Sequence, residues 1–421
     1  MTRRSSRLLR RTLFLFFALF AFCSASSIAA SQMALGVSLV LFLVIAMVDR
    51  HRSHEKPLRW FYLSVLLYVA WLFVTALLGA TPLKSMFILK EEWLFLIVPL
   101  GVYLFRSEKI SEWLLLSLGM GSIIASVFGV FRFLQDMHWF QAPFNVEDGS
   151  SVYQLSGFFS HSLTYGNYMA VVSLFLLGFT VSSFDRFRGW KRTLLVSSIV
   201  LTMIATGLSN ARGPVLALAV GLVASGFLFQ KMRYALVTLL IVILVGSVAS
   251  GGLVQRFKEQ FHVDTQLRYE GGRLFIWNNS LKVIRDHPLL GVGQGNFRGE
   301  YIKQLRPDIG ERRKLTHAHS DYLNVAAIAG IPGLLFYLGV WGVVLRYLWR
   351  GIRATEFSHF RRSLSIGAFL ASVGFMVSSL TEATFADEEV RQLMMFIWAA
   401  GLSVWYNEST SSEEDEIRHS S

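Results

Sequence analysis

A short polar segment late in the chain carries two histidines, His317 and His319, followed by Asp321. Imidazole titrates near neutral pH, so either histidine could remove the proton from an acceptor hydroxyl group. The same side chains could hold a metal ion, but helical metal ligands are usually spaced three or four residues apart. Two interfacial histidines that only hydrogen-bond to their neighbours are the third possibility. The segment alone leaves these three roles open.

Other basic side chains could bind an anion. Arg212 lies in a turn that needs Gly213 and Pro214 for its geometry but needs no arginine. A charge at the mouth of two apolar helices is costly and indicates function, with snorkelling to lipid headgroups as the alternative. The remaining members of the set are Lys84, Lys90, His161 and Arg273. Lys90 could instead pair with a neighbouring carboxylate. A lipid-held diphosphate would suit the set, because guanidinium groups bind phosphate oxygens in pairs.

The composition decides what kind of elements position these residues. The chain has 421 residues, of which 53% are hydrophobic and 16% are charged. A soluble protein has about 25% charged residues. A soluble enzyme, a fibrous protein and a disordered regulator are therefore excluded. The single cysteine, Cys23, can form neither an intrachain disulfide nor a thiolate metal site.

Apolar stretches long enough to cross a bilayer predict an all-α, polytopic membrane protein with about twelve spans. We place the spans at 12–30, 32–49, 58–79, 84–105, 111–134, 163–183, 192–209, 212–229, 233–252, 322–349, 362–381 and 391–406. This predicts an N-terminal bundle (1–252), one large outer loop (253–321), a C-terminal set of helices (322–406) and a disordered cytoplasmic tail (407–421).

The distribution of Lys and Arg predicts that both termini are cytoplasmic. With that orientation, 23 of the 40 basic residues lie on the inside, and the short outer segments hold only 5. The remaining ones lie in the long outer loop, which is largely exempt from the positive-inside rule. Much of the net charge of +12 is thus a topology signal, and a nucleic-acid partner is not needed. The predicted anion-binding residues and both histidines all fall on the outer face.

Within the large loop, residues 273–285 have helical spacing, and residues 291–297 form a glycine-rich turn. The glycines resemble a dinucleotide fingerprint only superficially, because no strand precedes them and the loop faces away from the cytoplasm. We expect this turn to fold back toward the membrane.

Several short sequence motifs, in their order along the chain, resemble those of the O-antigen ligase family, which shares its core domain with Wzy-type polysaccharide polymerases. The motifs are Gly272–Trp277, Pro288–Phe297, His317–Leu323 and Gly330–Leu334, with Ser209–Gly213 and Gly157–His161 upstream. About twelve spans and one large outer loop late in the chain also fit this family.

The resemblance implies a GT-C-type membrane glycosyltransferase in the bacterial inner membrane, with its active site on the periplasmic face. It would move a glycan from undecaprenyl diphosphate to a sugar hydroxyl of lipid A–core by an inverting displacement, without a cofactor or metal. The family's base maps to His319. Because Ser320 stands where Asn is common, His317 remains a second candidate. The family's diphosphate arginines map to Arg212 and Arg273.

Two other functions are weighed against the ligase. A polymerase of the same superfamily would share the chemistry but use a growing polysaccharide as the acceptor, and nothing in the residues decides between the two. A transporter or flippase would carry charges near the bilayer midplane in broken helices. Here the predicted spans are nearly free of charge, and the charges crowd one interface.

Overall fold

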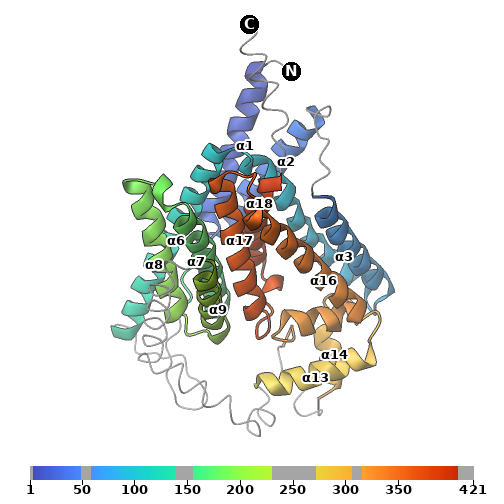
Figure 1. Ribbon diagram of the computed structural model, residues 1–421. Coiled ribbons are helices and arrows are strands. Elements are labelled where there is room, and N and C mark those ends of the chain that lie inside the picture. The colour runs from blue at the N-terminus through green and yellow to red at the C-terminus, as the bar shows by residue number, and fades with distance from the viewer. Residues whose placement is uncertain (1–2, 49–57, 139–154, 230–271, 306–314, 406–421) are drawn as a thin grey trace.

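A computed structural model describes residues 3–48, 58–138, 155–229, 272–305 and 315–405, and this part of the chain is helical with no strand (Figure 1). Seven described helices are long and apolar enough to cross a membrane. They are α2 (Ile28–Val48), α3 (Arg59–Leu78), α6 (Glu108–His138), α7 (Ser162–Ser182), α8 (Trp190–Leu208), α16 (Asp321–Arg353) and α17 (His359–Ser378). The predicted all-α membrane architecture is confirmed. The number of spans stays a prediction, because the stretch 233–252, the loop residues 253–271 and the tail 407–421 lie outside the described residues.

Two helices form the centre of the bundle. In α7, every residue from 164 to 180 is buried, and in α18 (Glu388–Leu402) every residue from 390 to 402 is buried. Helices that are apolar on all sides belong in such a core. The close approach of α17 to α7 depends on glycines, because a Cβ on Gly178 would meet the Cα of Gly367 at 2.8 Å. Three further helices, α1 (Arg3–Cys23), α9 (Arg212–Leu228) and the short α5 (Ile97–Phe105), complete the bundle.

The fourth predicted span is not one continuous helix. It consists of α4 (Pro82–Leu89), a 3₁₀ segment η1 (Lys90–Leu96) and α5. The irregular part carries Glu91 and Glu92, which both pair with the buried Arg391 of α18 at 3.4 and 3.2 Å. Hydropathy alone does not reveal such a break, because the charges are neutralised by a partner far away in the sequence.

The tenth predicted span corresponds to α16, which begins at Asp321 as expected and is kinked at Gly330. This glycine has φ +72° and ψ 179°. A Cβ there would meet the carbonyl oxygen of Leu289 at 2.0 Å, so the close approach requires glycine. Pro332 follows directly, where the first turn of a new helix tolerates it. The nine residues before Gly330 thus form a separate helical segment next to the loop.

The described part of the outer loop contains α13 (Arg273–Asp286) and α14 (Phe297–Lys303), which lie together at the lower end of the molecule in Figure 1. The glycine-rich turn between them packs on the first segment of α16. The N–H groups of Val292 and Gly293 donate to the carbonyls of Ala327 and Ile328, both at 2.9 Å. This turn is therefore a structural support for α16.

The two ends of the bundle each gather the segments that the charge distribution assigns to one side. At one end, Glu108 at the start of α6 accepts hydrogen bonds from Arg186 at 2.8 Å and from Ser358 at 2.6 Å. Arg186 belongs to η2 (Phe184–Arg186), and Ser358 caps α17. All three positions are predicted to be cytoplasmic. The opposite end brings together the starts of α7, α13 and α16 and the turn between α17 and α18.

Candidate active site

His319 lies just before α16 in a strained backbone conformation. Its φ is +48°, and within the described ranges Asn210 (φ +52°) is the other non-glycine residue with a positive φ. A left-handed conformation costs an L-residue about 1–3 kcal/mol and persists only where the surroundings enforce it. The indole N–H of Trp277 on α13 donates to the carbonyl of His319 at 3.3 Å. This hydrogen bond helps to hold the backbone of the histidine in place.

Glu382 faces His319 from the α17–α18 turn, which we define as residues 379–387. Its side chain is only 2% exposed, and its Oε2 lies 3.9 Å from Nδ1 of His319. That Nδ1 is buried and has no hydrogen-bond partner among the described side chains and backbone. A shift of about 1 Å would close the gap to a hydrogen bond. A carboxylate at Nδ1 favours the tautomer that leaves Nε2 free to accept a proton.

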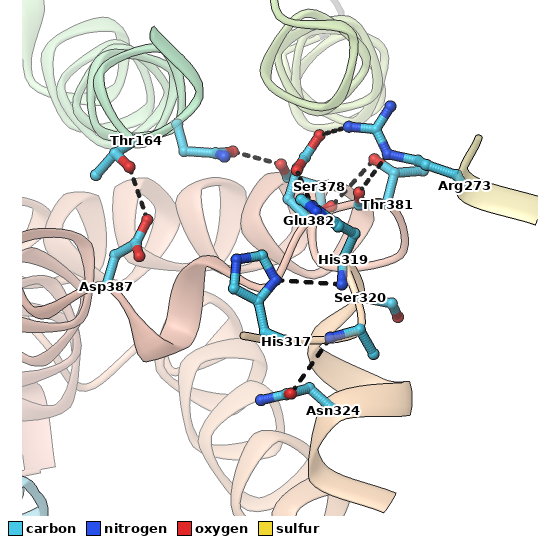
Figure 2. A network of polar contacts seen from close by, with 12 residues as sticks. Thr164, Arg273, His317, His319, Ser320, Asn324, Ser378, Thr381, Glu382 and Asp387 are labelled. Carbon is cyan, nitrogen blue, oxygen red and sulfur yellow. Dashed lines mark hydrogen bonds and ion pairs between the residues drawn. The ribbon is translucent and has the colours of Figure 1, made fainter. Parts of the chain in front are cut away.

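Arg273, at the start of α13, binds the other oxygen of the same carboxylate. Its Nη2 pairs with Oε1 of Glu382, and its Nε donates to the carbonyl of Thr381 at 2.9 Å. Figure 2 shows the remaining guanidinium nitrogen pointing away from Glu382. Glu382 thus joins the predicted base to one predicted phosphate-binding arginine, while Arg273 keeps a donor for an anion.

The turn that carries Arg212 packs against the same carboxylate. Arg212 begins α9, and the next residue, Gly213, sits so close that a Cβ there would meet Glu382 Cγ and Thr381 Oγ1 at 3.0 Å. The hydroxyl of Ser378 donates to Asn167 of α7 beside this contact (Figure 2). The structure therefore brings the start of α9, where Arg212 lies, against the same carboxylate that pairs with Arg273.

His317 lies beside His319 but is arranged differently. Their ring centroids are 4.4 Å apart, and Nδ1 of His317 accepts from the backbone N–H of His319 at 3.3 Å. Burial lowers the pKa of His317 to about 4, with a further contribution from the neighbouring charges of His319 and His161. A neutral imidazole whose Nδ1 already accepts a hydrogen bond carries its proton on Nε2, so it is a poor base at neutral pH. The arrangement favours His319.

A second carboxyl group lies on the far side of the histidines from Arg273 (Figure 2). Asp387 accepts a hydrogen bond from Thr164 of α7 at 2.8 Å. Burial raises the pKa of Asp387 to about 6, against the opposing effects of the Thr164 hydrogen bond and the charge of His161. His161 lowers the pKa of both Asp387 and His317 electrostatically. This predicted residue therefore lies near the edge of the site.

Lys84 and Lys90 have partners elsewhere at the same end of the molecule. Lys84 Nζ donates to the carbonyl of Gly295 at 2.5 Å, and Lys90 Nζ lies 3.7 Å from the ring centroid of Phe87. Lys84 therefore supports the glycine-rich turn. The diphosphate-binding role of both lysines stays a prediction.

The described residues include no group of three or more His, Cys, Asp or Glu side chains that could hold a metal ion. Whether the chemistry is independent of metal stays a prediction.

Residues 194–338 match the family described as O-antigen ligase. The chain carries an O-antigen ligase family domain. Comparison with curated proteins finds no match. The domain supports a ligase- or polymerase-type enzyme in O-antigen biosynthesis, with a glycosyltransferase-like activity and with polysaccharide and lipid-linked substrates in general.

The O-antigen ligase match covers only part of the site. Arg212, Arg273, His317 and His319 lie inside residues 194–338, whereas Glu382 and the rest of the α17–α18 turn lie beyond them. The two carboxylates that surround the histidines thus come from outside the matched region. Sequence reasoning missed both of them because it weighed cations at the outer face and not acids.

Asp387 and His317 give the stability of this protein opposite pH dependences. The pKa of Asp387 is about 6, above its ordinary 3.8, so the folded state keeps a proton that the unfolded chain loses. Its contribution to stability therefore falls as the pH rises from about 4 to 6. The pKa of His317 is about 4, below its ordinary 6.5, so the unfolded chain is protonated first. Its contribution rises with pH over about 4 to 6.5.

We therefore expect single variants to separate two effects that partly cancel in the wild type. In Asp387→Asn, the thermal unfolding midpoint in detergent should climb more steeply from pH 4.5 to 6.5 than in the wild type. In His317→Gln, the midpoint should climb less or fall over the same window. Both variants following the wild-type curve would contradict the two pKa values.

Proposed function

We propose that this enzyme transfers a glycan from undecaprenyl diphosphate to a sugar hydroxyl group of lipid A–core at the periplasmic face of the bacterial inner membrane. One observation carries the proposal. The buried carboxylate of Glu382 pairs with Arg273 through Oε1 and approaches Nδ1 of His319 through Oε2 at 3.9 Å. The Glu382 side chain would thus hold both the base that deprotonates the acceptor, His319, and a cation that binds the leaving group, Arg273.

The proposed reaction is a single displacement with inversion. The acceptor oxygen attacks the anomeric carbon as Nε2 of His319 takes its proton, and the bond from that carbon to the diphosphate oxygen breaks. The leaving group departs as a stable lipid diphosphate and needs no proton. Arg212 and Arg273 stabilise the negative charge that develops there. Glu382 stabilises the imidazolium that forms on His319.

The proposed orientation has both termini in the cytoplasm. It is supported by the 23 basic residues on the inner side against 5 in the short outer segments. It is also supported by the separation of the bundle ends, because Glu108 and its partners Arg186 and Ser358 lie at the end opposite the histidines. The donor's lipid chain would then lie in the bilayer with its diphosphate at the outer interface.

A transporter has weaker support. Charges in a broken helix do occur at Glu91 and Glu92, but Arg391 pairs with both of them. These ion pairs fasten η1 to α18, which is a structural role. Arg273 and the strained histidine lie instead at one end of the bundle.

The ligase and the polymerase are separated by the glycolipids that a deletion strain accumulates. Deleting the gene should abolish glycan-capped lipopolysaccharide and leave polymerised glycan on its lipid carrier, as resolved by glycolipid gels and mass spectrometry of the carrier fraction. Restoration by the wild-type chain, but not by His319→Ala, is the matched control. Accumulation of single repeat units on the carrier would instead assign the chain as a polymerase.

A further inference from the structure

We propose that Asp321 is a positioning residue that holds His319 in its strained, Glu382-facing conformation by fastening the histidine segment to the α17–α18 turn. The inference rests on the proposed function, in which His319 is the base. Asp321 itself is two residues from His319 and is only 2% exposed.

The side chain of Asp321 is bound at both oxygens by the α17–α18 turn. Ser379 Oγ donates to Oδ2 at 2.7 Å. The backbone N–H of Phe385 donates to Oδ1 at 3.1 Å and to Oδ2 at 3.2 Å. A buried carboxyl group in such a position satisfies donors that have no access to water, and losing it would leave them unpaired.

The backbone of the same residue makes a second set of contacts with this turn. The N–H of Asp321 is shared between the carbonyls of Ser379 at 3.0 Å and Glu382 at 3.1 Å. The neighbouring Ser320 Oγ donates to the same Ser379 carbonyl at 3.3 Å. The contact with the carbonyl of Glu382 matters most. It links the backbone next to His319 to the residue whose carboxylate faces His319.

These contacts explain how a histidine keeps φ at +48°. Trp277 binds the carbonyl of His319. The hydrogen bonds of Asp321 with the α17–α18 turn, which we call the Asp321 clamp, hold the chain two residues later. Relaxation of His319 to an ordinary conformation would therefore break several hydrogen bonds at once. The same clamp fixes the Glu382 backbone. Misplacing a catalytic group by about 1 Å can cost on the order of 10²-fold in rate.

The test compares three variants in a transfer assay with membranes that contain equal amounts of protein. Asp321→Ala should lower kcat by about 10- to 100-fold with little change in KM for the lipid-linked donor. Asp321→Asn keeps the shape and an acceptor for Phe385 N–H, so it should retain activity within about 5-fold. Tyr322→Phe is the matched control. It removes a hydrogen bond of 2.8 Å from the next residue to Met376 of α17 without touching the clamp, and it should keep the wild-type rate.

A double variant separates positioning from general support. In a His319→Ala background, Asp321→Ala should cost less than about 3-fold more, because its effect acts through the missing base. Full additivity, or a Tyr322→Phe loss as large as that of Asp321→Ala, would overturn the proposal. If His319→Ala is impaired but Asp321→Ala and Asp321→Asn both keep the wild-type kcat, only the positioning role fails. If His319→Ala itself keeps full activity, the proposed function of the site fails instead.

Discussion

Replacing His319 by alanine is expected to slow glycan transfer by about 10²–10⁴-fold, the usual contribution of general acid–base catalysis. The protein should still insert and accumulate normally. The buried Nδ1 of His319 has no hydrogen-bond partner within the described structure, so its removal breaks no hydrogen bond of that atom. Initial rates in membranes with matched protein levels provide the measurement. KM for the donor should change little, since the imidazole acts in the transition state.

His317→Ala is the paired control for this prediction. Its pKa of about 4 and the hydrogen bond that its Nδ1 accepts from His319 make it a poor base at pH 7. We expect a loss of about 10-fold or less, from poorer positioning of its neighbour. Full activity of His319→Ala together with loss of transfer in His317→Ala would reverse the assignment of the base.

Glu382→Gln is expected to lower kcat by about 10²-fold or more. The amide has the size of the carboxylate but not its charge, so it can stabilise neither the imidazolium of His319 nor the guanidinium of Arg273. Losing the carboxylate behind a catalytic histidine has an effect of this order or larger in the serine protease triad. The measurement is the kcat and KM for the donor.

The chain offers a closely matched control for this substitution. Glu300 of α14 also joins a basic side chain and a histidine, with Lys303 at 2.6 Å and His287 at 3.8 Å, but it lies away from the site. Glu300→Gln should leave the rate unchanged, since surface ion pairs contribute about 0–1 kcal/mol to stability. Equal rates for Glu382→Gln and the wild type would remove Glu382 from the mechanism.

Much of the site could be predicted because topology restricts it. Once the spans are oriented, Arg212, Arg273 and His319 must lie at one face. In the structure Arg273 and His319 both approach Glu382, and Gly213, the residue after Arg212, packs against it. Being on one face does not mean being in one site, however. Lys84 lies on that face and bonds to Gly295 in the glycine-rich turn instead.

Glu382 could not be placed from the sequence because its partners are distant in the chain. Arg273 precedes it by 109 positions, and the tertiary packing of α17 against α7 and α9 helps to bring the α17–α18 turn to the histidines. A signal was nevertheless present. A carboxylate in a short outer turn between two apolar helices carries the same cost as Arg212 does, and that cost indicates function. The breaks at Gly330 and at Glu92 depend on tertiary contacts in the same way, so hydropathy predicted continuous spans.

Reconstituted transfer tests the central claim most directly. The purified chain would be placed in liposomes with an undecaprenyl-diphosphate-linked glycan and lipid A–core, with a chelator and without any nucleotide sugar, and the products separated by mass spectrometry. We expect lipid A–core that carries the glycan, release of undecaprenyl diphosphate in equal amount, and inverted configuration at the new linkage. We also expect that His319→Ala forms product at least about 10²-fold more slowly. Retained configuration, or equal product formation by His319→Ala, would contradict a single displacement assisted by this histidine.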